Sequence, residues 1–160
     1  MVIRPATPAD QDAIWTVIEP IIRAGETYAL DRGMNRAQAL AYWCSLDREV
    51  FVAEEEGRVV GTYFLRANQA GGGGHVANTG YAVHPRATGR GIARALCAHS
   101  LETARARGFK AMQFNFVVST NAPAVHLWQA MGFAIAGTMP GGFAHPVHGF
   151  VDAHIMYRTL

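Results

Sequence analysis

The segment from Val83 to Ala93 constrains this chain more than any other. It reads Val-His-Pro-Arg-Ala-Thr-Gly-Arg-Gly-Ile-Ala and follows a strand-like run, His75 to Val83. The apolar residues of Ile92 to Arg107 then recur at helical spacing, so a strand, a glycine turn and a long helix follow one another. The first N–H groups of a helix have no partner within it, and together with the helix dipole they form an anion site. The segment therefore predicts a binding site for a pyrophosphate.

Two glycines and three arginines support this interpretation. Gly89 and Gly91 would let the backbone approach a ligand closely, and Arg86, Arg90 and Arg94 would add positive charge at the same helix end. The alternative is a glycine-rich turn with solvated arginines. The segment has neither the Gly-Lys-Ser/Thr of a Walker loop nor the GxGxxG pattern, so neither a P-loop nor a dinucleotide fold is indicated.

Hydrophobic periodicity predicts the other elements. Strands are expected at residues 2–4 and over Val50–Glu54, Arg58–Ala67, His75–Val83, Ala111–Val118, Phe133–Thr138 and His154–Thr159. Helices are expected after Thr7-Pro8, over Arg36–Ser45 and Ile92–Arg107, and after Asn121. Pro20 falls inside the first helical pattern and should kink or divide that helix. Helices alternate with strands only in the middle of the chain, so we expect an α+β fold with a mixed sheet.

Composition excludes several classes of protein. The 160 residues fit one domain spanning 1–160, and a hydrophobic share of 50% excludes intrinsic disorder. No apolar run approaches the roughly 18 residues of a membrane span, and the start does not resemble a secretory signal. Cys44 and Cys97 fit no disulfide framework, so a cytoplasmic location is expected. The net charge of +2 is too weak to favour nucleic acid, and histidines 145, 148 and 154 lack a metal-ligand spacing, so no metal is expected.

Two motifs resemble those of a known family, the GCN5-related N-acetyltransferases (GNAT). Arg86-Ala-Thr-Gly-Arg-Gly91 resembles the Arg/Gln-x-x-Gly-x-Gly/Ala motif with which that family binds the pyrophosphate of acetyl-coenzyme A (acetyl-CoA). Asn121-Ala-Pro-Ala-Val-His-Leu-Trp-Gln-Ala-Met-Gly-Phe133 is similar to its second motif, Asn-x-x-Ala-x-x-Leu-Tyr-x-x-x-Gly-Phe. The resemblance implies a mixed, mostly antiparallel sheet of six to seven strands, flanked by about four helices, and acetyl-CoA as the acetyl donor.

The resemblance also implies cofactor-binding residues. Backbone groups of Tyr81, Ala82 and Val83 would bind the pantetheine amides, and an N–H group near Val83 would stabilise the oxyanion. Backbone N–H groups would hold the pyrophosphate along the stretch Arg86, Ala87, Thr88, Gly89, Arg90, Gly91, Ile92 and Ala93. Asn121 would contact the pantetheine arm, cap its helix, or do both.

The chain departs from the family pattern at two positions. Trp128 replaces the Tyr of the second motif, and an indole N–H can donate a hydrogen bond but is no practical proton source. We expect Trp128 to pack beside the cofactor. Asn78 stands on the strand where many members carry a Glu that acts as the general base. An amide cannot act as a base, but it can orient a substrate by hydrogen bonds. Asn115, between two Phe residues, would either satisfy backbone groups or face the acceptor. Asn78 and Asn115 are the catalytic candidates, and the general base is left open.

Glu26, Tyr28 and Asn78 are the substrate-binding candidates. Glu26 would either pair with an amine or be a solvated loop residue. Together Asn78, Asn115 and Asn121 resemble asparagines of fungal enzymes that acetylate azetidine-2-carboxylate and other proline analogues. The resemblance therefore implies direct acetyl transfer to a small-molecule amine, such as an amino acid or a toxic analogue. The alternatives are acetylation of proteins or peptides and a non-catalytic acyl-CoA sensor. A homodimer is expected.

Overall fold

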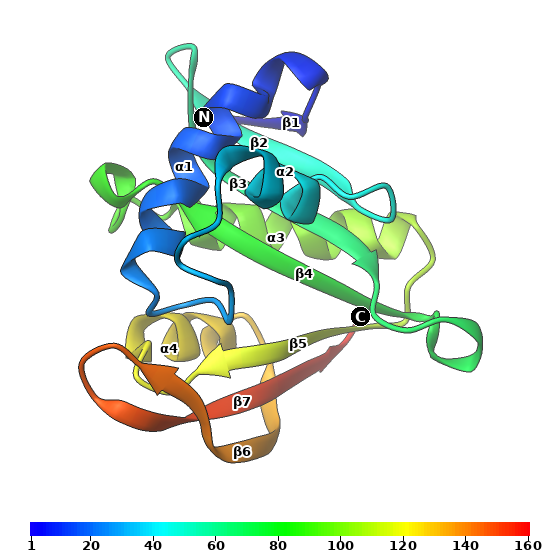
Figure 1. Ribbon diagram of the computed structural model, residues 1–160. Helices are drawn as coiled ribbons and strands as arrows, with labels where there is room; N and C mark the ends of the chain where they lie inside the picture. Colours follow the sequence, from blue (N-terminus) through cyan, green and yellow to red (C-terminus); the bar gives the residue numbers. More distant parts are fainter.

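The computed structural model describes residues 1–160, which form one seven-stranded sheet in the order β1-β2-β3-β4-β5-β7-β6 (Figure 1). The strands are β1 (Val2–Pro5), β2 (Glu49–Glu55), β3 (Arg58–Ala67), β4 (Val76–Val83), β5 (Ala111–Val118), β6 (Ala134–His145) and β7 (Gly149–Thr159). The helices are α1 (Gln11–Ala24), α2 (Arg36–Trp43), α3 (Ile92–Ala106) and α4 (Ala122–Ala130). The α+β class, the element order and the mixed sheet are confirmed.

Strands β4 and β5 form the one parallel pair in an otherwise antiparallel sheet. They pair only where Val76–Asn78 lies beside Ala111–Gln113. Beyond Asn78 the two strands diverge without a ladder, and Figure 1 shows β5, β7 and β6 turning away from β4. The sheet therefore opens at its middle.

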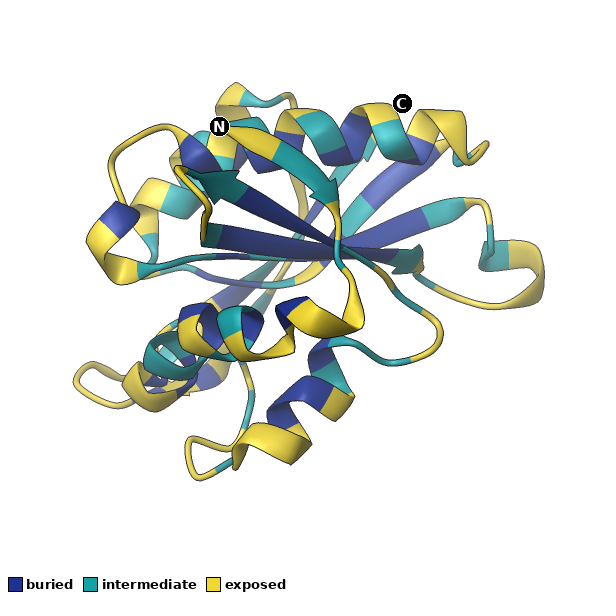
Figure 2. Cartoon of the chain, turned by 90° about the horizontal axis from the view of Figure 1, so that it is seen from above, coloured by how far each residue is buried: buried dark blue, intermediate teal, exposed yellow.

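Two apolar clusters hold the helices on the sheet, one on each face. On one face, residues of α1 and α2 pack with Val52, Phe64 and Ala82. On the other, α3 and α4 pack with residues that include Tyr63 and Phe114. Successive residues of a strand point to opposite faces, so β4 contributes to both clusters. Figure 2 shows the strands largely buried between helices whose outer sides are exposed.

Helix α1 continues through Pro20 as one element, so of the two expected effects, a kink or a division, the division does not occur. The apolar side of α1 explains this, since Ile14, Val17, Ile18 and Ile22 are all buried in the same cluster. Their packing keeps both halves of the helix in phase and offsets the backbone hydrogen bond that proline cannot donate.

The last two strands are longer than predicted. The prediction ended the first of them at Thr138 and began the second at His154. In the structure Pro140-Gly141-Gly142 forms an irregularity between Met139 and Phe143, after which the ladder resumes at Phe143 opposite Val151. A β-bulge absorbs extra residues without ending a strand. None of the helices is long and apolar enough to cross a membrane.

Candidate active site

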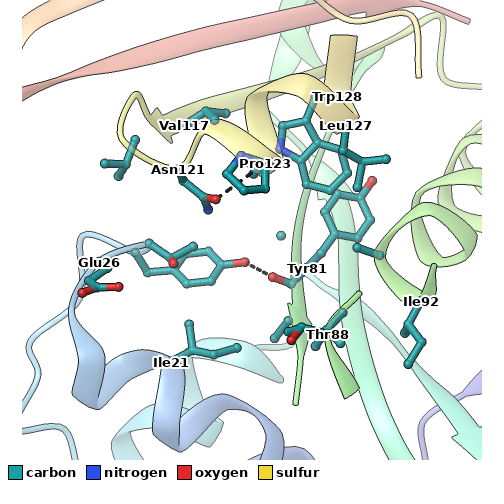
Figure 3. A pocket seen from close by; sticks show the side chains of 18 of the residues that line it. Ile21, Glu26, Tyr81, Thr88, Ile92, Val117, Asn121, Pro123, Leu127 and Trp128 are labelled. Carbon is teal, nitrogen blue, oxygen red and sulfur yellow. Dashed lines mark hydrogen bonds between the residues drawn. The ribbon is translucent and has the colours of Figure 1, made fainter. Parts of the chain in front are cut away.

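A cavity of about 680 Å³ lies where β4 and β5 diverge (Figure 3). Its walls come from the end of α1 and the loop that follows, from β4 and β5, and from the first turns of α3 and α4. The predicted site residues that line it are Glu26, Tyr28, Tyr81, Ala82, Val83, Thr88, Gly89, Gly91, Ile92, Ala93, Asn121 and Trp128. The fold therefore brings together most of the residues that the sequence singled out.

The start of α3 has the groups needed to bind a pyrophosphate. No backbone acceptor takes the N–H groups of residues 89–94. Gly89 and Gly91 have φ values of 75° and 78°, which residues with a side chain rarely adopt, and a Cβ at either position would meet no atom within 4 Å. The free N–H groups and the open space beside them fit the phosphates of acetyl-CoA.

Beyond the last ladder pair, Asn78 with Gln113, the edge of β4 that faces β5 has no β5 partner along the cavity. The N–H of His84 donates to the carbonyl of Val60, and hydrogen-bonded residues alternate along an antiparallel pair. It follows that Thr79, Tyr81 and Val83 direct their backbone groups toward β5. In addition, the Thr79 side chain is only 6% exposed and its hydroxyl has no hydrogen-bond partner. This edge can therefore bind the amides of a pantetheine arm.

Helix α4 supplies Asn121 and Trp128 to the opposite wall. The Asn121 side chain caps the helix by accepting a hydrogen bond from the N–H of Ala124 at 3.4 Å, so its role as a cap is confirmed. Trp128 is 8% exposed and lies over Tyr81, with 5.0 Å between the ring centroids. The Tyr81 hydroxyl bonds to Ser100 at 2.7 Å, and burial raises its pKa well above the usual value. Because this hydroxyl is bonded on the α3 side, Tyr81 contributes its backbone and the face of its ring to the cavity.

The loop after α1 lines the other end of the cavity. Its residue Tyr28 donates a hydrogen bond from Oη to the carbonyl oxygen of Tyr81 at 2.5 Å. Its ring packs edge-on against Trp43, and burial raises the pKa of the Tyr28 hydroxyl far above its usual value. Glu26 is the only carboxylate in the lining, and Arg94, at the opposite end, is the only cation. In Figure 3 Glu26 and Asn121 lie on the side away from Ile92.

The two catalytic candidates, Asn78 and Asn115, lie outside the cavity lining, so their catalytic role stays a prediction. Asn78 donates from Nδ2 to the carbonyl of Gln113 at 3.0 Å and accepts from Arg66 Nε at 3.3 Å, so it closes the last paired position of β4 and β5. Asn115 donates to Asn68 Oδ1 at 2.7 Å and accepts from Gln113 Nε2 at 2.8 Å. Both amides are therefore engaged within the chain.

Two of the three predicted arginines, Arg86 and Arg90, are not among the lining residues. Arg90 forms an ion pair with Glu55 at 2.6 Å, and the side chain of exposed Arg86 makes no hydrogen bond. Only Arg94 reaches the lining. Thr79, Gly80 and Phe116 also line the cavity but were not among the predicted site residues. They neighbour Asn78 and Asn115 on the same strands, so the alternation of side chains along a strand could have indicated them. No three His, Cys, Asp or Glu side chains lie close enough together to hold a metal ion.

Comparisons with known proteins agree with this geometry. The profile of the Acetyltransferase (GNAT) family matches residues 15–133. N-acetyltransferase aca1 of Schizosaccharomyces pombe is 28% identical over 151 residues, which cover 84% of this chain and 72% of that protein. The structure of a GCN5-related N-acetyltransferase from Kribbella flavida superposes with a TM-score of 0.95 at 42% identity, covering 99% of this chain and 97% of the other.

A further solved structure carries the donor. It is yncA from Salmonella typhimurium, solved with its cofactor acetyl-CoA, with a TM-score of 0.88, 26% identity and coverage of 100% of this chain and 94% of the other. The family profile, the shared fold and the free backbone groups around the cavity lead to the same conclusion. The chain belongs to the GNAT family and is an N-acetyltransferase that uses acetyl-CoA as its acetyl donor.

Proposed function

We propose that the acetyl acceptor is the amine of a small molecule, such as an amino acid or an analogue of one. The observation that carries this proposal is the hydrogen bond from Tyr28 to the Tyr81 carbonyl, which fixes the loop after α1 to the backbone of β4 at the acceptor end of the cavity. A loop fixed in this way favours a compact acceptor over an extended peptide. Glu26, the one carboxylate in the lining, gives an ammonium group a partner of opposite charge.

Different residues of the cavity bind the acetyl donor and orient the acceptor amine. Acetyl-CoA supplies an activated acetyl thioester. The N–H groups of residues 89–94 and the edge of β4 would hold it in place, and the N–H of Val83, which is directed toward β5, would donate to the thioester carbonyl oxygen. Glu26 would orient the ammonium group, and because this side chain is exposed the ammonium can lose its proton to solvent. The neutral amine would then form a C–N bond with the acetyl carbon as the C–S bond breaks, and the CoA thiolate would leave and take a proton from solvent. The Trp128 indole packs beside the donor.

The test is thiol release from acetyl-CoA against a panel of amines. The panel contains azetidine-2-carboxylate, hydroxyproline, methionine sulfoximine, polyamines and short peptides, and calorimetry measures acetyl-CoA binding in parallel. We expect turnover with a small amine. Turnover with peptides alone would contradict the proposal in favour of a protein acetyltransferase, and binding without turnover would indicate an acyl-CoA sensor.

Glu26→Gln tests the acceptor end directly. Loss of a charge-assisted contact should lower kcat/KM for the amine about tenfold or more, with the affinity for acetyl-CoA retained. Glu19→Gln is the matched control, since Glu19 lies on α1 outside the lining and pairs with Arg23 at 3.6 Å. Equal activity of Glu26→Gln and wild type would remove Glu26 from the acceptor site.

We also propose that the protein is a homodimer in the cytoplasm. Support for a dimer comes from the hairpin of β6 and β7, where Val147 and Phe150 are 74% and 82% exposed. Light scattering on the purified protein gives its mass directly, and a monomer at micromolar concentration would contradict the dimer.

A further inference from the structure

A row of polar side chains crosses the sheet beside the acceptor end of the cavity. The register that pairs Glu49 with Leu65 brings Arg48 next to Arg66, and Arg66 pairs with Asn78 on β4. Arg66 donates from Nε to Asn78 and from Nη1 to Asp47 at 3.2 Å, which leaves its Nη2 group without an acceptor. Asn78 directly precedes Thr79 and Gly80, which line the cavity, so the row borders the site.

Arg48 is the unusual member of this row. Its guanidinium carbon lies 4.2 Å from the ring centre of Tyr42 and 4.0 Å from that of Phe64. Cation–π contact with two rings holds the guanidinium in one orientation. Its Nε and Nη1 are buried without a hydrogen-bond partner, and no carboxylate pairs with it. Contact with the two rings offsets part of the cost of burying these donors, and the charge of the guanidinium has no ion-pair partner in the chain.

Phe64 connects Arg48 to the cavity. The guanidinium of Arg48 lies over the Phe64 ring. The edge of the same ring lies against Gly80, where an added Cβ would be 2.7 Å from Phe64 Cε1 and 3.2 Å from Tyr28 Oη. Burial raises the pKa of the Tyr28 hydroxyl, and the positive charge of Arg48 lowers it. The electrostatic field of Arg48 therefore extends to the acceptor end of the cavity.

We propose that Arg48 and Arg66 form a binding site for a carboxylate that the acceptor carries beside its amine. This inference rests on the proposed function and narrows it to amino-acid acceptors. The open donors are Nη2 of Arg66 and Nη2 of Arg48, the one nitrogen of its guanidinium that is not among the buried unpaired atoms. Guanidinium groups bind carboxylates through paired N–H donors. Glu26 attracts the ammonium end, so opposite charges at the two ends orient a zwitterion.

The experiment measures binding without turnover. Azetidine-2-carboxylate, hydroxyproline and methionine sulfoximine are each paired with their carboxamide, which keeps the shape and removes the charge. Calorimetry follows the binding of each compound to protein saturated with CoA, which has no acetyl group to transfer. Wild-type protein should bind at least one acid about tenfold or more tightly than its carboxamide.

The variants are Arg48→Gln and Arg66→Gln, with Arg36→Gln as the matched control. Arg36 is an arginine of α2 that pairs with exposed Asp12 at 2.6 Å, outside the cavity lining. Each test variant should reduce the preference for the acid to about twofold or less, and the control should keep it. If Arg48→Gln does not fold, Arg66→Gln carries the test, because its partly exposed side chain lies outside the apolar clusters.

Three results would overturn the inference. They are equal binding of acids and carboxamides to the wild type, an undiminished preference in both test variants, and no binding of any acid. Failure of the proposed function has another signature, namely the absence of turnover with every amine. A preference for acids in the CoA complex without turnover would refute the proposed function and leave the carboxylate site standing.

Discussion

Tyr28→Phe removes one oxygen atom and isolates the bond that ties the loop after α1 to β4. The phenyl ring keeps its edge-on packing against Trp43, whose centroid lies 5.8 Å away, so the change adds no cavity. What is lost is the 2.5 Å hydrogen bond to the Tyr81 carbonyl. A buried acceptor left without its partner typically destabilises a protein by about 1–3 kcal/mol.

The expected value lies in the lower half of that range. The Tyr81 carbonyl faces the cavity, where water can replace the hydroxyl. A loss of about 1–1.5 kcal/mol corresponds to a fall in Tm of about 2–6 °C for a chain of this length. The freed loop should also raise the KM for the acceptor, while the affinity for acetyl-CoA should not change, because the free N–H groups of residues 89–94 are intact.

Thermal unfolding followed by calorimetry measures the first effect and steady-state kinetics the second. Tyr157→Phe is the matched control, since that hydroxyl makes no hydrogen bond within the chain and Tyr157 lies on β7. An unchanged Tm in Tyr28→Phe would refute the role of this bond in stability. A weaker affinity for acetyl-CoA with an unchanged acceptor KM would refute the assignment of the loop to the acceptor end.

Three further changes test other parts of the structure. Gly89→Val should weaken acetyl-CoA binding at least about tenfold in calorimetry, because a β-branched residue disfavours the φ of 75° that presents the N–H groups. The control is Gly71→Val, at a φ of 56° in another loop, which should leave binding unchanged. Asn121→Ala should cost about 1 kcal/mol of stability and also weaken acetyl-CoA binding, whereas Asn35→Ala, which removes the cap of α2, should lower stability alone. The Arg4 guanidinium holds the pKa of Asp10 well below its usual value. The stability that this carboxylate contributes is therefore present above about pH 4 and is lost as the pH falls further. In Asp10→Asn, acid unfolding should lack this pH-dependent loss of stability.

Local sequence signals predicted the elements whose ends are marked by caps and turns. Asn35 caps α2 as expected, accepting a hydrogen bond from the N–H of Gln38 at 2.9 Å, and Arg58–Ala67 forms a strand with the predicted bounds. The bulge at Pro140–Gly142 could not be predicted, because it depends on pairing with β7 rather than on its own composition. The same limit explains Pro20, whose local effect is overridden by packing on the sheet.

The cofactor end of the site was predictable and the acceptor end was only partly so. Backbone N–H groups at a helix start follow from the order of a strand, a glycine turn and a helix, which is visible in the sequence. The roles of Asn78 and Arg90 depend on partners more than 30 positions away, Gln113 and Glu55. A polar side chain near a site can serve the sheet instead of a ligand, and only the three-dimensional neighbours decide which.

The short parallel pairing of β4 and β5 also has a consequence for solvent exchange. Tyr81 and Val83 lie beyond the last paired position, so no β5 carbonyl accepts their amide hydrogens. These amides should exchange with deuterium quickly in the free protein, although the strand around them is ordered and largely buried. A donor that fills the opening would replace the missing rungs of the ladder and slow that exchange. The same contacts would couple ligand concentration to unfolding, with a stabilisation that grows as RT ln(1 + [L]/Kd).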